Sequence, residues 1–120
     1  SIMFVFLITA VLFLVFALIG YFTKTDLTKL GSILFMGLLG IILASLLNLI
    51  FKSESFDLVL IILGIIIFIG YIAYDINKVK RLEGMVDEDK LAIIGALDLY
   101  LDFLNLFIRL IQIFGKSNDN

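Results

Sequence analysis

Three long stretches of the chain consist mostly of apolar residues and carry no charged side chain. They cover residues 1–23, 30–51 and 58–74, and short polar connections separate them. A helix that crosses the bilayer core, which is about 30 Å thick, needs about 20 apolar residues, with about 17 to 25 accepted. The pattern therefore predicts membrane-spanning helices at residues 2–22, 27–51 and 56–79. Thr25 or Asp26 is the expected cap of the second helix, and Ser55 that of the third.

The fourth apolar stretch differs because polar side chains recur in it at every third or fourth position. Residues 91–114 read LAIIGALDLYLDFLNLFIRLIQIF. At 100° per residue, the polar positions fall within a sector of about 80° on one face of a helix. These positions are Asp98, Asp102, Asn105, Arg109 and Gln112. The pattern predicts a fourth helix at residues 90–114, whose polar face contacts protein or a water-filled cavity rather than lipid.

The overall composition is that of an integral membrane protein. Of the 120 residues, 62% are hydrophobic, and the mean hydropathy is +1.20. A soluble domain of this length would leave too much of that apolar surface in water. We therefore expect one all-α domain at residues 1–115, a polytopic transmembrane helix bundle in a lipid bilayer. Residues 116–120 form a short polar tail that we expect to be disordered.

Several kinds of chemistry are excluded by the residue types that the chain lacks. It contains no cysteine, histidine or tryptophan, and its net charge is −2. Thiol nucleophiles, disulfides, haem ligation, zinc sites with nitrogen or sulfur ligands and Ser-His-Asp catalysis all need cysteine or histidine. The net charge gives no indication of nucleic-acid binding. We expect neither an enzyme nor a resident cofactor.

The basic residues predict the orientation of the helices. The connections after the first and third helices carry Lys24, Lys29, Lys78, Lys80, Arg81 and Lys90, whereas the opposite side has only Lys52 and Lys116. Because loops rich in lysine and arginine stay in the cytoplasm, the first and third connections are predicted to be cytoplasmic, or on the matrix side of an organelle. The expected location is the bacterial inner membrane, with an organellar inner membrane as the alternative.

Three aspartates lie at least one helical turn inside the predicted spans. Asp75 belongs to the segment IAYDINKVK near the end of the third helix. Asp98 and Asp102 lie about 10 Å and about 16 Å along the fourth helix from Leu91, at 1.5 Å per residue. Insertion of an aspartate at the bilayer centre costs about 2.5–3.5 kcal/mol. Aspartates inside the spans therefore indicate a structural or functional role. Asp75 could also simply cap or snorkel beside Lys78.

Two carboxylates that approach each other in a low dielectric cannot both stay ionised, so they share a proton. Such a pair can respond to pH, or hold a cation when both groups are ionised. Depth alone favours Asp98 as the partner of Asp75, although a tilted fourth helix would bring Asp102 level instead. Arg109 lies near the far boundary, where we expect it to snorkel to the interface, with Asn105 between it and Asp102.

The segments AYDINKVK, GALDLYLDFLNLF and RLIQIFG resemble the C-terminal signature of the Bax inhibitor transmembrane family. The segment GYFTKTDLTKLGSILFMGLLGIILASLLNLIF is similar to the bacterial branch of that family, so the resemblance covers essentially the whole chain. It implies a seven-helix fold of which these are the last four helices, and upstream helices that are missing from this chain.

The resemblance also implies a calcium leak that is gated by pH through a pair of hydrogen-bonded aspartates. The matching positions here are Asp75 and Asp102, which could also bind calcium transiently. The chain departs from the family in two respects. Asp98 replaces a small polar residue and adds a third carboxylate to the expected pathway. In addition, the arginine of the second family helix that engages the pair has no counterpart in these residues.

Two functions remain open at this point. The first is a pH-sensitive calcium leak or ion pathway that uses Asp75, Asp102 and Asp98, supported by Asn105, Arg109 and Gln112. The second is a non-conducting partner that regulates other membrane proteins, such as an ATP-dependent membrane protease, because bacterial relatives of the family resemble modulators of that protease. An intramembrane aspartyl protease is disfavoured, because its motifs pair YD with GxGD and this chain has GALD.

Overall fold

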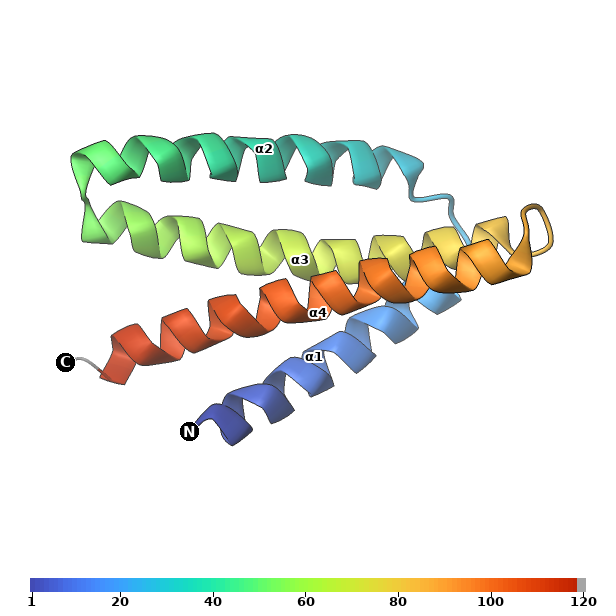
Figure 1. The fold of residues 1–120 in the computed structure, drawn as a ribbon, viewed down its shortest axis with the longest axis horizontal. Helices are drawn as coiled ribbons and strands as arrows, with labels where there is room; N and C mark the ends of the chain where they lie inside the picture. The colour runs from blue at the N-terminus through green and yellow to red at the C-terminus, as the bar shows by residue number, and fades with distance from the viewer. Residues whose placement is uncertain (119–120) are drawn as a thin grey trace.

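Four helices make up nearly all of the computed structural model, which describes residues 1–118: α1 (Ile2–Phe22), α2 (Thr28–Phe51), α3 (Glu54–Leu82) and α4 (Glu88–Asn118) (Figure 1). Within these residues there is no strand. Each helix is long and apolar enough to cross a membrane, and large apolar side chains are exposed along all four. Such a surface suits contact with lipid. The predicted all-α transmembrane bundle is confirmed.

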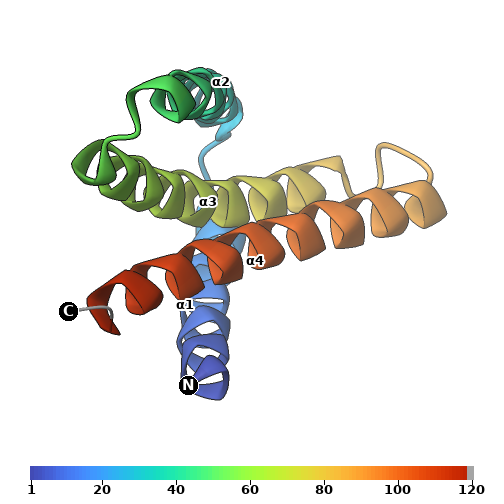
Figure 2. The same cartoon turned by 60° about the vertical axis from the view of Figure 1, so that its left-hand side comes forward.

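Helix α3 lies at the centre of the bundle. It packs against α1, α2 and α4, and α1 also packs against α4, whereas α2 packs against α3 alone within the described chain (Figure 2). The buried core joins α1, α3 and α4 through Val5, Phe68, Ile72, Leu106 and Leu110. Helices α2 and α4 therefore stand on either side of α3 without packing on each other.

Helices α1 and α3 make a particularly close backbone contact. A Cβ atom added at Gly20 would lie 2.7 Å from the Cα atom of Ala73. Small residues allow helix backbones to approach in this way within a membrane. The contact fixes α1 against the half of α3 that carries Asp75.

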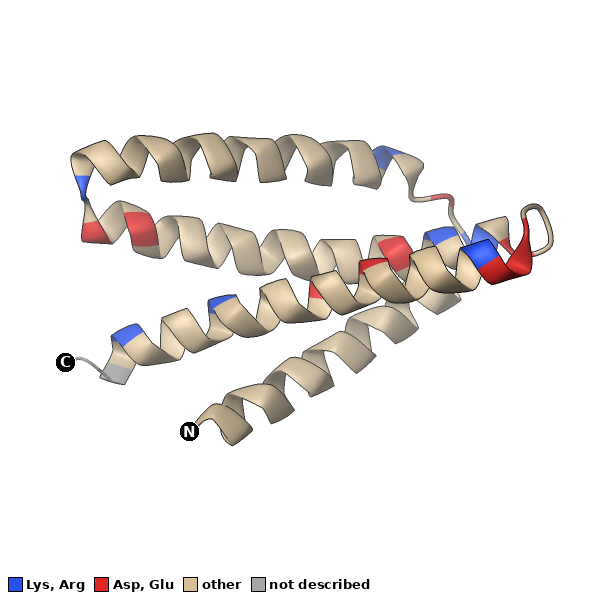
Figure 3. Cartoon of the chain, viewed as in Figure 1, with Lys and Arg blue, Asp and Glu red and all other residues tan. Residues whose placement is uncertain are grey.

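The connections divide between the two ends of the bundle. Those between α1 and α2 and between α3 and α4 lie at one end, and the α2–α3 connection lies at the other end with the start of α1 (Figure 1). Basic side chains gather at the first of these ends, together with several acidic ones (Figure 3). The two connections that are predicted to be cytoplasmic thus share one end.

The observed starts of α2 and α3 correct the predicted caps. Helix α2 begins at Thr28, one residue later than predicted, and its N-cap is Leu27 rather than Thr25 or Asp26, with no side-chain bond from the cap. Asp26, just before the cap, accepts the Thr28 backbone N–H with Oδ1 at 2.9 Å. Helix α3 begins at Glu54 and ends at Leu82, so it exceeds the predicted range of 56–79 at both ends. Its cap is Ser53 rather than Ser55, because the Ser53 hydroxyl accepts the Phe56 N–H at 3.2 Å.

Helix α4 is longer at both ends than the predicted range of 90–114. It begins at Glu88 and continues to Asn118, so the disordered tail predicted at 116–120 is wrong for residues 116–118. Lys116 forms an ion pair with Asp57 of α3 at 3.0 Å, which ties the last turn to the bundle. Residues 119–120 of the predicted tail lie outside the described residues.

Candidate functional site

The structure brings Asp75 of α3 and Asp102 of α4 together at the seam between these two helices. Both side chains are buried, with exposed fractions of 7% and 5%. Both side chains line the same groove, close enough for each carboxyl group to act on the other. Among the described residues, Asp102 Oδ2 is the one buried side-chain polar atom with no donor of its own. Ionised carboxylates only accept hydrogen bonds, so a bond between the two requires one proton.

Apolar packing positions this carboxyl pair, by which we mean the side chains of Asp75 and Asp102. Ile72 lies one turn before Asp75, Leu106 lies one turn after Asp102, and neither has any exposed surface. Ile72 and Leu106 both belong to the core that joins α3 to α4. Side chains three or four residues apart share a helix face, so the packing of the core turns both aspartates toward the seam.

Asp98 is a neighbour of the pair rather than a member of it. It is half-buried, and its charge acts on both Asp75 and Asp102 without a hydrogen bond to either. Depth along the helices favoured Asp98 as the partner of Asp75, and the structure instead places Asp102 there. Helix α4 runs at an angle to α3, so positions at the same depth cannot be matched by counting residues from the connection (Figure 2).

The carboxyl pair lines a groove of about 580 Å³ between α2 and α4, with α3 beneath it. We call this the carboxyl-pair groove. Leu38 and Ile42 of α2 form an apolar wall, whereas α3 and α4 supply polar groups. The polar lining consists of Tyr71, Tyr74, Asp75, Lys78, Asp98, Asp102, Asn105 and Arg109. Most of the polar face predicted for the fourth helix thus faces protein and this groove.

Two further cavities share wall residues with the carboxyl-pair groove. The Gly95 cavity, of about 300 Å³, lies at the α3–α4 connection and shares Asp75, Lys78 and Asp98 with the groove. The Gln112 cavity, of about 310 Å³, lies toward the other end and shares Arg109. The three spaces therefore follow one another along α3 and α4.

Arg109 points into the bundle, so the prediction that it snorkels to the interface is wrong. Its Nη1 atom donates to Asn105 Oδ1 at 3.1 Å, and its guanidinium lies 4.8 Å from the ring centre of Phe68. A Cβ atom added at Gly64 would lie 2.7 Å from Arg109 Cδ. The absent side chain at Gly64 and the aromatic face of Phe68 make room for the guanidinium inside. Gln112 is exposed and lines the cavity named after it.

Asn77 is a buried polar residue near the site that the sequence pattern did not single out. Its side chain is 1% exposed, and its Nδ2 atom donates to the carbonyls of Gly20, Thr23 and Thr25 at 3.1–3.3 Å. Its Oδ1 atom accepts from Arg81 Nε at 2.8 Å and from the Leu27 backbone N–H at 3.4 Å. Two residues after Asp75, the Asn77 amide lies on the opposite face of the same helix. A polar side chain inside an apolar span was the feature of the sequence that could have indicated its buried contacts.

Charged groups reinforce this attachment of the first connection to α3. Arg81 forms an ion pair with Asp26 at 3.4 Å, and the Lys80 ammonium donates to the Tyr21 carbonyl. The hydroxyl and backbone N–H of Thr28 donate to the Asp26 carboxylate and hold its pKa below the ordinary value of 3.8. These contacts fix the α1–α2 connection beside the end of α3 that carries Asp75.

No group of three or more carboxylate, histidine or cysteine side chains is arranged to hold a metal ion within residues 1–118. Calcium takes six to eight oxygen ligands. The two carboxyl groups of the pair contain four oxygens, fewer than this number.

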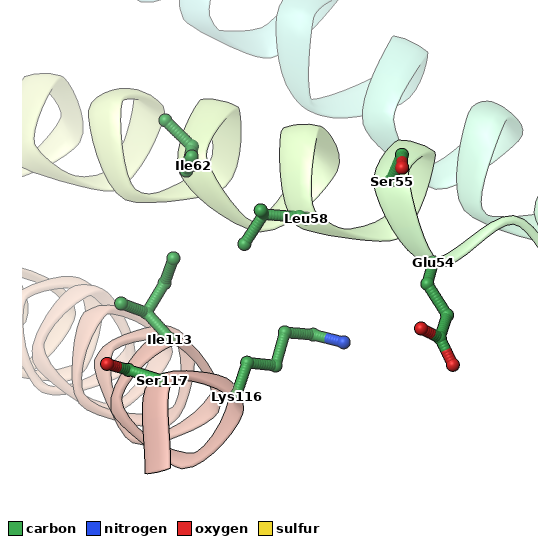
Figure 4. Close-up of a pocket in the computed structure, with 7 residues that line it drawn as sticks. All are labelled: Glu54, Ser55, Leu58, Ile62, Ile113, Lys116 and Ser117. Atoms are coloured by element: carbon green, nitrogen blue, oxygen red, sulfur yellow. The ribbon is translucent and has the colours of Figure 1, made fainter. Parts of the chain in front are cut away.

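A larger cavity, of about 790 Å³, lies at the other end of the bundle, between the start of α3 and the end of α4. Figure 4 shows Leu58 and Ile113 reaching into the space between the two helices. The remaining lining residues are Glu54, Ser55, Ile62, Lys116 and Ser117. None of the predicted site residues lines this space, so the candidate site is the carboxyl-pair groove.

Residues 1–119 match the model of a family described as inhibitor of apoptosis-promoting Bax1. The chain is 46% identical over 117 residues to the inner membrane protein YbhL of Escherichia coli K12, covering 92% of this chain and 50% of YbhL. It is 44% identical over 125 residues to a Borreliella burgdorferi protein, covering 100% of this chain and 54% of that protein. The chain thus spans about half the length of the curated relatives it matches.

Proposed function

Because the chain belongs to the family of membrane proteins described as inhibitor of apoptosis-promoting Bax1, as its sequence motifs predicted, we propose that it forms the gate of a pH-sensitive calcium leak. The carboxyl pair of Asp75 and Asp102 is the proposed gate. The protein is an integral membrane protein, and the name of its relative YbhL supports a place in the bacterial inner membrane.

The observation that carries the proposal is a buried pair of carboxyl groups that line one groove, Asp102 Oδ2 having no hydrogen-bond partner; the two groups can bond to each other only if they share a proton. While the proton is shared, the bond joins α3 to α4 across their seam. When the proton leaves, two negative charges remain side by side in a poorly solvated place. At about 4 Å and an effective dielectric constant of about 20, such charges repel by about 4 kcal/mol. That energy favours separation of the two helices at the seam. The oxygens of the two deprotonated carboxylates are then available to bind a cation.

The adjoining cavities supply the proposed route to and from the gate. Asp75 and Asp98 line both the Gly95 cavity and the carboxyl-pair groove. A carboxylate at the junction attracts cations from the α3–α4 connection, because rings or clusters of acidic side chains concentrate them in channels. We therefore assign Asp98 to attraction of the ion and the carboxyl pair to control by pH.

The test is calcium flux through the intact protein in liposomes, measured over a series of pH values. Asp75→Asn and Asp102→Asn each remove one ionisable group with little change in shape, so each should flatten the dependence of flux on pH. Asp98→Asn is the matched control: it should lower the flux and keep a pH dependence, with a shifted midpoint because the Asp98 charge acts on both members of the pair. Equal effects of all three substitutions would instead indicate a site of three carboxylates.

A pH response that neither Asp75→Asn nor Asp102→Asn changes would refute the proposed gate. The alternative function, regulation of another membrane protein such as an ATP-dependent membrane protease, would then be favoured. That function would have to be tested by the activity of the partner protein instead of by calcium flux.

A further inference from the structure

Arg109 occupies the boundary between two of the cavities. It lines the carboxyl-pair groove and also the Gln112 cavity, and it is the one residue that the two linings share. Its guanidinium is half-buried and lies against Phe68 of α3 at 4.8 Å. Within residues 1–118, no carboxylate forms an ion pair with it. A positive charge without an ionic partner therefore lies between the groove and the cavity.

Three contacts hold the guanidinium in this position. Nη1 donates to the side chain of Asn105 at 3.1 Å and to its carbonyl at 3.4 Å. Asn105 is itself held by a hydrogen bond from Nδ2 to the Leu101 carbonyl at 2.8 Å. The third contact is with Gly64, where any side chain would displace the Arg109 side chain. These contacts orient the charge across α3 instead of toward the interface.

We propose that Arg109 is a second, electrostatic barrier in the pathway, placed between the carboxyl-pair groove and the Gln112 cavity. The inference rests on the proposed function, because it concerns the same route for cations. A fixed positive charge in a narrow, poorly solvated passage repels cations, and channels use arginine in this way. Calcium is repelled more strongly than a monovalent cation because its charge is twice as large. Opening of the carboxyl pair alone does not remove this charge.

The inference assigns different tasks to the two sites. The carboxyl pair responds to protons, whereas arginine stays charged at all physiological pH values. Arg109 therefore sets the level of the leak at every pH, and the pair sets how that level changes with pH. Movement of the guanidinium off Phe68 and Gly64 is the step that clears the passage.

Calcium flux through the intact protein in liposomes tests the barrier. Arg109→Gln removes the charge but keeps a polar side chain, and it should raise the flux about tenfold at all pH values, which corresponds to about 1.4 kcal/mol. Arg109→Lys keeps the charge but loses the hydrogen bonds from Nη1, so its flux should lie between the values of the wild type and of Arg109→Gln. A flux equal to that of Arg109→Gln would contradict a barrier made by the charge. An Arg109→Gln flux that is unchanged or lower would overturn the proposal.

Gly64→Ala provides a variant that keeps every charge. The new methyl group displaces the Arg109 side chain, so the flux should rise in the same direction as with Arg109→Gln. Gly40→Ala is the matched control, because a Cβ atom there meets no other atom within 4 Å. Equal fluxes for the two glycine variants would contradict the inference.

Labelling of introduced cysteines separates this inference from the proposed function, and the chain has no native cysteine to interfere. Leu38→Cys lies in the carboxyl-pair groove and Ser45→Cys in the Gln112 cavity. A cationic thiol reagent applied from the Gln112 side should label Ser45→Cys in both backgrounds, but Leu38→Cys only when Arg109→Gln is present. Labelling of Leu38→Cys with Arg109 intact would refute the barrier. This result does not depend on whether substitutions in the carboxyl pair change the calcium flux, so it tests the barrier separately from the gate.

Discussion

Replacement of Asn77 by alanine removes the side chain that joins the α1–α2 connection to α3. The amide makes five hydrogen bonds to three segments of the chain, and it is 1% exposed. Three of its partners are carbonyls at or beyond the end of α1, where no further helical N–H is available to them. Arg81 would also lose the acceptor that directs it toward Asp26.

The expected loss follows from these contacts. An intramolecular hydrogen bond contributes about 0.5–1.5 kcal/mol net, and a buried polar group left without a partner costs about 1–3 kcal/mol. The carbonyls of Thr23 and Thr25 lie in the connection, where water can replace the amide, whereas Gly20 is buried. We therefore expect Asn77→Ala to lower the free energy of unfolding by about 3 kcal/mol, with Gly20 as the main source.

The assay is reversible unfolding of the purified protein by a denaturing detergent, followed by circular dichroism. Asn48→Ala is the matched control, because that amide also exchanges hydrogen bonds across a connection but only with Ser53, five residues away. We expect a loss of about 1 kcal/mol for Asn48→Ala. Equal losses for the two variants, or a smaller one for Asn77→Ala, would refute the reasoning that burial and long-range contact make Asn77 the stronger tie.

Three further predictions concern other parts of the bundle. Gly20→Ala should lower the unfolding free energy by about 1–3 kcal/mol in the same assay, because the methyl group meets the backbone of α3. Cysteines introduced at Glu83 and Ser117 should react from opposite sides of intact cells, and reaction of both from one side would contradict the predicted orientation. Asp26 has a lowered pKa when folded, so its bond with Thr28 stabilises the fold above the unfolded pKa and is lost as the pH falls through the folded pKa. Carbon-13 NMR titration should find that Thr28→Val raises the pKa of Asp26 toward 3.8.

The helices could be predicted from the sequence because each depends on a local pattern. Apolar runs of sufficient length predict spans, and the spacing of Asp98, Asp102 and Asn105 predicts a polar helix face. The cap of α3 was harder to predict. Lys52 has a φ of 53°, and the Asn48 side-chain amide hydrogen-bonds to the backbone of Ser53. The α2–α3 connection is therefore short, and α3 is capped by Ser53 instead of the predicted Ser55.

The details of the site depend on contacts between helices, which periodicity within one helix does not contain. Whether Asp98 or Asp102 meets Asp75 is decided by how α4 crosses α3 and by the packing of the core. The inward direction of Arg109 depends on Gly64 in another helix, 45 residues earlier in the chain. Such contacts are visible only once the elements are placed in space.

The central claim is that Asp75 and Asp102 act as one unit, and a double-mutant cycle on the pH-dependent calcium flux tests it most directly. Wild type, Asp75→Asn, Asp102→Asn and the double variant are compared in liposomes at the same protein density. If one shared proton links the two groups, either single substitution abolishes the pH response, and the double variant behaves like each single variant. Effects of the two substitutions that simply add would mean that the carboxyl groups act separately, and they would contradict the account.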